Sequence, residues 1–325
     1  MKKNIAVVGC GYWGKNLVRN FSELEVLSSI CDPDTETANK YASQYNVKNS
    51  SFTEIINDLN IKGVVLAVPA PLHASMAIEA MNKGKHVFVE KPIAMNETEA
   101  ELMITTAKKN NVKLMVGHLL QYHPIFKTIR KIVNADEIGE LNYIYSNRLS
   151  FGEIRTKEDV IWSFAPHDIS MILSLAGQDP EFIITKSTSI IQKNIADTAT
   201  IHMEFKSGLK SHISVSWLHP YKEHKLVVSG KSAMLVFDDT KPWNEKLALY
   251  PYEVVSSKGI INLRKSDVKY LEVPEEEPLK NECRDFIDVV EKNIKPMTDG
   301  AEGLRVIKVL SAASKSKTIN EAVKL

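Results

Sequence analysis

Short apolar runs alternate with amphipathic stretches over the first 120 residues of the chain. Apolar runs rich in β-branched residues occupy residues 4–8, 26–31, 63–68, 86–89 and 113–117, which is typical of buried strands. Stretches with helical periodicity lie between them, at residues 35–45, 72–83 and 96–110. Such alternation predicts a doubly wound parallel sheet that binds its ligands at the carboxyl ends of the strands.

The pattern changes after Pro124, where apolar and polar residues begin to alternate. Leu141 to Phe151, Asp197 to Phe205 and Leu209 to Trp217 have the period of two that half-buried antiparallel strands show. We expect their apolar sides, Trp217 included, to pack on a helical layer. Residues 279–290 and 304–310 carry the apolar stripes of two closing helices.

The predicted fold class is therefore α/β with two domains. Residues 1–122 form an N-terminal Rossmann domain with a doubly wound parallel sheet. Residues 123–325 form a C-terminal α+β domain for substrate binding and oligomerisation, with a large, mostly antiparallel open sheet.

Composition narrows the possible functions. The chain has 325 residues, and Lys+Arg 41 against Asp+Glu 40 leaves no charge excess that would favour nucleic acid or an anionic membrane. Three cysteines without metal-ligand spacing predict neither a disulfide framework nor a metal site. The apolar run at residues 5–8 is short for a signal peptide, so we expect a cytoplasmic protein.

A glycine-rich turn follows the first apolar run. Gly9, Gly11 and Gly14 have the GxGxxG spacing of dinucleotide-binding loops. We expect Tyr12 and Trp13, between the last two glycines, to contribute to cofactor binding by packing near the adenine or the domain junction. Gly9 permits the tight turn, Gly11 lets the backbone approach a pyrophosphate, and Gly14 allows close packing of helix on strand. The phosphates then bind at the helix N-terminus.

Asp32 ends the second apolar run, about 20 residues beyond the glycines. A carboxylate at this place accepts hydrogen bonds from the adenosine ribose and repels a 2′-phosphate, which favours NAD over NADP. Asp34 adds a second negative charge. The alternative is that Asp32 caps the helix at residues 35–45.

Further polar residues follow the later apolar runs. They are Pro69, Pro71 and His73 after the third run, Glu90, Lys91 and Pro92 after the fourth, and His118 and Tyr122 after the fifth. Glu-Lys-Pro in a chain that opens with this glycine loop resembles the Gfo/Idh/MocA oxidoreductase family, named for glucose-fructose oxidoreductase and inositol dehydrogenase. The resemblance extends over nearly the whole chain, from Gly9 to the segment at residues 298–306.

The resemblance implies a role for each of these positions. The strand-end residues would bind NAD, and Lys91 would lie beside the nicotinamide and the substrate, where it has a catalytic role. Residues 162–169 and 216–223 resemble the branch that acts on nucleotide-activated sugars, which oxidises the C3 hydroxyl of UDP-N-acetylglucosamine or its uronic acid, or reduces 3-keto sugars. Many members carry Asp four residues before the histidine that matches His167, whereas this chain has Ser163. Asp168 points about 100° away around a helix and is not assumed to replace it.

Hydride transfer needs a group that takes the hydroxyl proton. We expect His167, at the start of an apolar helix, to accept this proton, while Lys91 hydrogen-bonds the same oxygen; the reverse assignment stays open. Basic and aromatic residues should surround a nucleotide sugar. The candidates are Arg148, Arg155, Trp162, Tyr221, His219 and Lys222, besides His118 and Tyr122, and each could instead have an ordinary strand or loop role.

Three functions remain open at this point. The first is a dehydrogenase of a nucleotide-activated sugar in the biosynthesis of cell-surface precursors, and the second is a free sugar or inositol dehydrogenase or a 3-keto-sugar reductase. The third is an NAD-binding regulatory module, which the loss of Asp at residue 163 favours and the presence of Lys91 and His167 opposes. The resemblance also implies a homodimer or homotetramer.

Overall fold

The computed structural model describes residues 2–257 and 259–325. The chain divides into two compact units, each described here by itself. Unit 1 contains residues 1–122 together with 277–307, and unit 2 contains residues 123–276 together with 308–325. None of the helices in the described ranges combines the length and the apolar content that crossing a bilayer requires.

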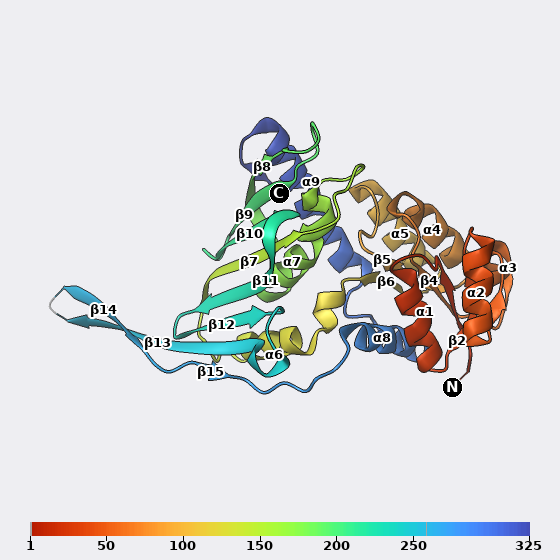
Figure 1. Ribbon diagram of the computed structural model, residues 1–325, viewed down its shortest axis with the longest axis horizontal. Helices are drawn as coiled ribbons and strands as arrows, with labels where there is room; N and C mark the ends of the chain where they lie inside the picture. The colour runs from red at the N-terminus through yellow and green to blue at the C-terminus, as the bar shows by residue number, and fades with distance from the viewer. Residues whose placement is uncertain (1, 258) are drawn as a thin grey trace. The chain divides into compact units, whose positions relative to one another are not determined.

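Unit 1 is built on a parallel sheet, four of whose strands are labelled in Figure 1. The strand order is β3-β2-β1-β4-β5-β6. Its strands are β1 (Ile5–Val8), β2 (Leu27–Cys31), β3 (Lys48–Asn49), β4 (Gly63–Leu66), β5 (His86–Glu90) and β6 (Leu114–Gly117). Its helices are α1 (Gly14–Glu23), α2 (Thr35–Tyr45), α3 (Phe52–Asn57), η1 (Ala70–Leu72), α4 (His73–Asn82), α5 (Glu97–Lys109), η2 (Leu119–Tyr122) and α8 (Pro278–Lys292). The predicted Rossmann arrangement is confirmed. The final helix α9 (Gly300–Ile319) begins in unit 1 and ends in unit 2.

Residues 277–307 lie in unit 1, although the sequence analysis assigned them to the second domain. The apolar stripe of α8 explains the difference, because Phe286 packs edge-on against both Phe21 and Phe88, with ring centroids 6.2 and 5.6 Å apart. Leu279 and Cys283 belong to the same buried cluster. The Rossmann sheet therefore depends on a helix from the far end of the chain to cover its apolar face.

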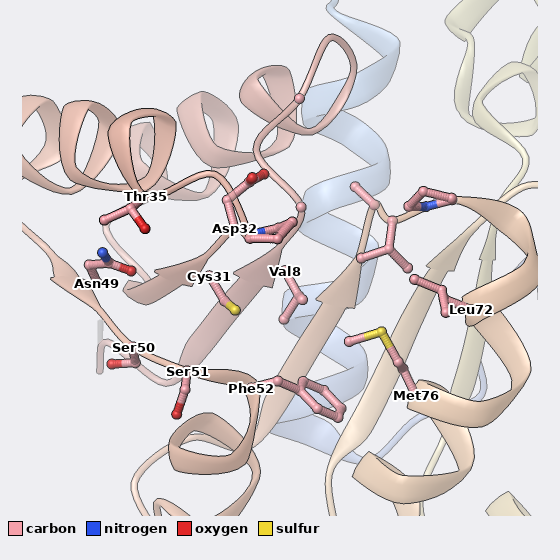
Figure 2. Close-up of a pocket in the computed structure, with 16 residues that line it drawn as sticks. Val8, Cys31, Asp32, Thr35, Asn49, Ser50, Ser51, Phe52, Leu72 and Met76 are labelled. Atoms are coloured by element: carbon pink, nitrogen blue, oxygen red, sulfur yellow. The ribbon is translucent and has the colours of Figure 1, made fainter.

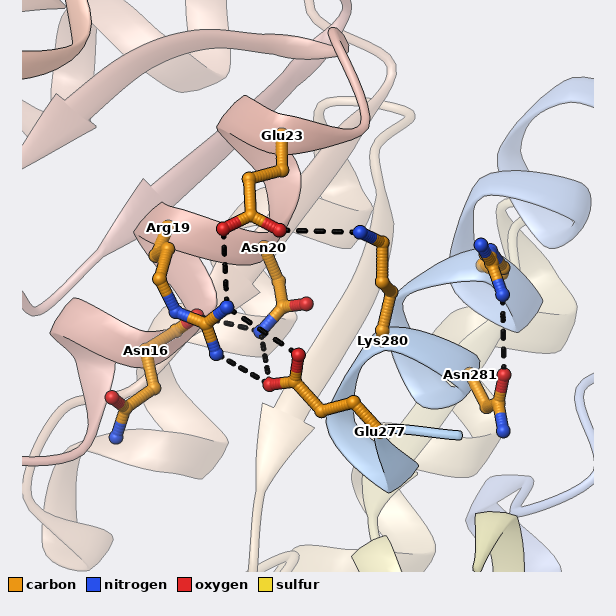
Figure 3. A network of polar contacts seen from close by, with 8 residues as sticks. Asn16, Arg19, Asn20, Glu23, Glu277, Lys280 and Asn281 are labelled. Atoms are coloured by element: carbon orange, nitrogen blue, oxygen red, sulfur yellow. Dashed lines mark hydrogen bonds and ion pairs between the residues drawn. The ribbon is translucent and has the colours of Figure 1, made fainter. Parts of the chain in front are cut away.

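A polar network joins α1 to α8 at the rim of this contact (Figure 3). Arg19 binds Glu277 and also Glu23, the latter at 3.1 Å, while Lys280 binds Glu23 at 3.2 Å. Asn20 donates from its amide to Glu277 over 3.1 Å. These ionic side chains are 31–42% exposed, so water and salt screen the pairs and each contributes little to stability. The buried aromatic contacts supply most of the stability here.

Unit 2 is built on a large sheet of ten described strands. Along the sheet they run β14-β13-β12-β11-β7-β10-β9-β8-β16, and β15 pairs with β13. The strands are β7 (Leu141–Phe151), β8 (Pro180–Thr188), β9 (Thr198–Phe205), β10 (Lys210–Ser216), β11 (Leu218–Gly230), β12 (Ala233–Asp238), β13 (Leu247–Ser257), β14 (Ile260–Lys265), β15 (Lys269–Tyr270) and β16 (Val323–Lys324). The helices are α6 (Pro124–Asn134), α7 (Val160–Ala176) and η3 (Trp243–Glu245). The sheet is mostly antiparallel, as predicted, but β7 and β10 run parallel.

The side of β7 that faces α7 is partly polar, which differs from the prediction. Ser146 and Arg148 both hydrogen-bond Asp168 of α7, so this side of the strand meets the helix. Tyr143 and Tyr145 lie on the other side, where both contact the His212 ring of β10. The buried acid on α7 explains the difference, because it needs donors from the strand beneath it. The prediction that Trp217 belongs to the core is confirmed, since its side chain is fully buried.

Candidate active site

The loop between β1 and α1 shows a different requirement at each glycine. Gly9 has a φ of +92°, and a Cβ there would lie 2.3 Å from the carbonyl oxygen of Ala67. A Cβ on Gly14 would lie 1.9 Å from the carbonyl oxygen of Gly9. A Cβ on Gly11 would meet nothing within 4 Å. The packing of the chain thus requires Gly9 and Gly14, while the space above Gly11 is open to a ligand.

A cavity of about 680 Å³ opens beside this loop at the carboxyl ends of the strands (Figure 2). The glycine loop, Asp32 and Pro69 contribute to it, as the sequence predicted. Leu72, at the predicted strand end after Pro69, forms an apolar wall together with Phe52 and Met76, which were not predicted. Phe52 begins α3 shortly after β3 ends, and this place near another strand end was the available signal. An apolar wall opposite a carboxylate suits a flat base joined to a ribose.

Asp32 accepts hydrogen bonds from the glycine loop and from the turn before α2. Its Oδ2 accepts a hydrogen bond from the Cys10 backbone N–H at 2.6 Å, and its Oδ1 accepts one from the Asp34 N–H at 2.9 Å. The residue that caps α2 is Asp34, whose side chain accepts from the backbone of Glu36 and Thr37. Asp32 is therefore not the helix cap, and it is one of the residues that line the cavity (Figure 2).

Cys10, the residue after Gly9, has an unreactive thiol. Burial, and then the negative charge of Asp32, raise the pKa of its thiol to about 12. A thiol with this pKa stays protonated at neutral pH and is a poor nucleophile.

The two aromatic residues of the glycine loop differ in their surroundings. Tyr12 is 86% exposed, with the Lys15 ammonium 5.3 Å from its ring centre. Trp13 donates its indole N–H to Oε1 of Glu90 at 2.6 Å. This bond joins the glycine loop to the Glu-Lys-Pro segment, and neither aromatic residue lines the cavity beside Asp32.

Glu90 ends β5, and Lys91 and Pro92 follow it. Glu90 also accepts from the backbone N–H of Lys91, at 3.3 Å, and burial raises the pKa of its carboxyl although the Trp13 bond opposes this shift. His73, at the start of α4, lies with its Nδ1 2.7 Å from the Pro92 carbonyl oxygen and its Nε2 2.8 Å from that of Val68. The imidazole is 1% exposed, and burial lowers its pKa. His73 thereby ties the Glu-Lys-Pro segment to the end of β4, while Pro71 lies in η1.

His118 and Tyr122, two candidates for substrate binding, are almost fully buried in unit 1. The Nδ1 of His118 lies 2.5 Å from a carboxylate oxygen of Glu302. The Tyr122 hydroxyl donates to Asp285 at 2.9 Å and lies 2.9 Å from the Thr298 hydroxyl. Both side chains therefore bind the C-terminal segment of the same unit.

In unit 2, His167 lies in the middle of α7, which starts at Val160 with Asp159 as its cap, and not at the start of the helix as expected. Its side chain is half-buried, and Ser163, one turn earlier, is buried. Asp168 is 1% exposed and receives two hydrogen bonds from Arg148, at 2.6 and 3.2 Å. Asp168 is thus engaged by the sheet, in agreement with the expectation that it does not replace the missing aspartate.

The other substrate candidates have the following contacts within unit 2. Arg148 is 13% exposed, and its guanidinium binds Asp168. Arg155 is 44% exposed and pairs with Glu153 at 3.2 Å. The Trp162 indole donates to the Ser314 hydroxyl at 2.9 Å, and Tyr221 is 61% exposed beside His219. Arg155 and Tyr221 are therefore the more accessible of the four.

The glycine loop, the cavity beside Asp32 and the parallel sheet define unit 1 as a dinucleotide-binding domain. Residues 3–118 match the family described as "Oxidoreductase family, NAD-binding Rossmann fold", and residues 126–236 match the "GFO/IDH/MocA C-terminal domain". The chain belongs to the Gfo/Idh/MocA family and is an NAD-dependent oxidoreductase.

The chain is similar to two dehydrogenases over most of its length. The UDP-N-acetylglucosamine 3-dehydrogenase of Acidithiobacillus ferrooxidans is 24% identical over 304 residues, which cover 93% of each chain. A solved structure of that enzyme has a TM-score of 0.85 at 21% identity and covers 96% of this chain and 97% of its own. The myo-inositol 2-dehydrogenase of Thermotoga maritima is 23% identical over 99% of this chain and 98% of its own. At these identities the structural likeness shows the fold.

Proposed function

We propose that the protein is an NAD-dependent dehydrogenase of a nucleotide-activated sugar, which oxidises the C3 hydroxyl of a UDP-N-acetylglucosamine-type substrate to a 3-keto sugar. This reaction would serve the biosynthesis of cell-surface polysaccharide or lipid precursors. The proposal is supported chiefly by the similarity to UDP-N-acetylglucosamine 3-dehydrogenase, which extends over more than nine-tenths of both chains in sequence and in structure.

The residues of unit 1 fit NAD. The open space above Gly11 would admit a pyrophosphate to the backbone N–H groups at the start of α1. Asp32 would accept hydrogen bonds from the ribose hydroxyls, and the apolar wall with Phe52 and Met76 would receive the adenine. When bound, NAD supplies the acceptor for the hydride that leaves the sugar carbon.

The protein's own side chains would move the hydroxyl proton. We assign His167 as the acceptor of this proton, because an imidazole titrates close to neutral pH. The Lys91 ammonium would donate a hydrogen bond to the same oxygen and stabilise the negative charge that develops there. Arg148 and Ser146 bind Asp168, the carboxylate adjacent in sequence, and we assign it no part in this step.

A free inositol is the second candidate substrate. The observation that favours it is the similarity to inositol 2-dehydrogenases from Thermotoga maritima and Rhizobium meliloti, at 23% and 22% identity and again over most of each chain.

Absorbance of the reduced nicotinamide would distinguish these candidates. Purified protein with NAD should reduce the cofactor when UDP-N-acetylglucosamine is added and should not do so with myo-inositol. The opposite result would favour the second candidate. Lys91→Ala should lower turnover by about 100-fold or more while NADH still binds, and Lys83→Ala, which removes an exposed lysine of the same unit, should leave turnover unchanged. Undiminished turnover in Lys91→Ala would refute the role given to this residue.

We also propose a homodimer or homotetramer in which the sheet of unit 2 meets another subunit. Tyr143, Tyr145 and His212 gather on the side of this sheet that faces away from α7. Aromatic side chains of this kind are enriched in protein interfaces. Sedimentation analysis would measure the oligomeric state, and a monomer would refute the proposal.

A further inference from the structure

The side chain of Trp13 links two segments of unit 1 that lie far apart in the sequence. Its indole N–H donates to Oε1 of Glu90 at 2.6 Å, across 77 positions of the chain. The glycine loop follows β1 and Glu90 ends β5, and in the sheet β4 lies between these two strands. Neighbouring strands lie about 4.8 Å apart, so the link spans two strand spacings, or about 10 Å. Only a long side chain reaches this far.

The shape of the glycine loop does not depend on this indole. Backbone groups hold the loop, because the Gly9 N–H donates to the Cys31 carbonyl oxygen at 2.8 Å and the Cys10 N–H donates to Asp32 at 2.6 Å. The Trp13 side chain is 37% exposed, so packing in the core does not account for it. What this side chain adds to the loop is the bond to the Glu-Lys-Pro segment.

The carboxylate of Glu90 also contacts the residues on its other side. Its Oε2 accepts a hydrogen bond from the Lys91 backbone N–H at 3.3 Å. A Cβ on Gly117 would lie 2.9 Å from the same oxygen, so the carboxylate occupies the space beside this glycine. One carboxylate thus binds both the Trp13 indole and the Lys91 backbone, and its orientation depends on both donors.

The other end of the Glu-Lys-Pro segment is fixed independently of the glycine loop. The His73 ring contacts the carbonyl oxygens of Pro92 and Val68. Loss of the Trp13 indole would therefore release the Glu90 end of the segment and leave the Pro92 end in place. Lys91, between these two ends, would lose one of its supports while the unit stays folded.

We propose that Trp13 is a positioning residue, which acts through Glu90 to fix the backbone of Lys91 relative to the glycine loop. The proposal rests on the catalytic role of Lys91 in the proposed function. The cofactor pyrophosphate would bind this loop and the Lys91 amine would meet the substrate oxygen, so the distance between the two places decides how well the reacting groups meet. Misplacement of a reacting group by about 1 Å can cost about 100-fold in rate.

Trp13→Phe tests this role, because it keeps a large aromatic ring and removes the indole N–H. The Kd for NADH should stay unchanged, since backbone N–H groups bind the phosphates. With UDP-N-acetylglucosamine as substrate, kcat should fall by about 10-fold or more while the KM for NAD stays close to that of the wild type. Trp243→Phe removes an indole donor from the Val273 carbonyl oxygen in unit 2 and should change neither value.

Two kinetic results would overturn the proposal. One is an unchanged kcat in Trp13→Phe. The other is a raised KM for NAD at unchanged kcat, which would mean that the indole binds the cofactor directly. Calorimetry of each variant would show that unit 1 is folded under the assay conditions.

A double variant tests whether Trp13 acts through Glu90. Glu90→Leu removes the acceptor of the indole bond, so it reaches the same broken link from the other side. Adding Trp13→Phe to Glu90→Leu should then slow turnover no further, because the two residues act as one unit. If the two effects multiply, Trp13 acts independently of Glu90 and the proposal is wrong.

Chemical labelling gives a measurement that needs no sugar. Mass spectrometry follows the acetylation rate of Lys91 with and without saturating NADH. Bound NADH should protect Lys91 in the wild type and in Trp243→Phe, and should protect it less in Trp13→Phe. Equal protection in all three proteins would overturn the positioning role and leave the proposed reaction intact. If UDP-N-acetylglucosamine is not turned over, the proposed substrate is wrong, and the labelling comparison still decides the role of Trp13.

Discussion

The glycine loop permits a test that separates folding from cofactor binding, because two of its glycines have opposite surroundings. An alanine at residue 11 would place its Cβ in open space, with nothing within 4 Å, whereas an alanine at residue 14 would place it 1.9 Å from the Gly9 carbonyl oxygen. The second contact is with backbone, so it can be relieved only by moving the loop or α1. Gly11→Ala should therefore keep the stability of the wild type, and Gly14→Ala should be less stable.

The magnitudes follow from these contacts. Overpacking of this kind costs about 1–3 kcal/mol, and a domain of this size loses about 2–4 °C of Tm per kcal/mol. Gly14→Ala should melt several degrees lower, and Gly11→Ala should stay within about 0.5 kcal/mol of the wild type. If the Cβ at residue 11 removes one backbone hydrogen bond to a phosphate, about 1.5–3 kcal/mol of binding is lost, or about 10- to 150-fold in Kd.

Fluorescence titration with NADH and scanning calorimetry measure the two effects separately. If Gly11→Ala has a normal Tm but binds NADH weakly, the result would support the proposal that the pyrophosphate binds above residue 11. Wild-type affinity in that variant would refute the reasoning, since it would mean that the pyrophosphate does not approach this backbone.

Three further predictions concern single side chains. Asp32→Ala should weaken NADH binding by about tenfold and NADPH binding less, because the repulsion of a 2′-phosphate is lost; an unchanged ratio of the two Kd values would contradict this. Asp168→Asn breaks the buried pair with Arg148, so the free energy of unfolding measured in urea should fall by about 3–5 kcal/mol. Glu253→Gln breaks an exposed pair, so the same free energy should fall by under about 0.5 kcal/mol. Burial lowers the pKa of His123 to about 4, so between pH 6.5 and 4 the unfolded chain binds more protons at this residue. The free energy of unfolding should therefore fall as the pH decreases, by up to about 1.4 kcal/mol per pH unit. His123→Asn can still cap α6 and should remove the contribution of this residue to the pH dependence of the unfolding free energy.

The architecture of each sheet could be predicted from the sequence because burial leaves a local pattern. The alternation at residues 141–151 marks β7 correctly, but alternation reports which residues share a side and not the direction of the neighbouring strand. The parallel pairing of β7 with β10 was therefore missed. In the same way, the apolar stripe of residues 279–290 predicts a helix without indicating which domain it covers.

The candidate site was predictable where one short motif carries the chemistry. The glycine loop and Asp32 are of this kind, and both line the cavity of unit 1. The bonds from Trp13 to Glu90 and from Arg148 to Asp168 join residues 77 and 20 positions apart. Such pairings depend on the assembled fold, and no local spacing encodes them.

Unit 1 consists of two segments that lie far apart in the sequence, and this has a consequence for folding during synthesis. On the ribosome, residues 1–122 emerge long before residues 277–307 that complete the same unit. Until Phe286 arrives, Phe21 and Phe88 lack the ring that packs between them, and the nascent sheet exposes apolar surface while all of residues 123–276 are being translated. A chain that stops at residue 276 should therefore aggregate or require a chaperone, even though it contains every strand of the dinucleotide-binding sheet.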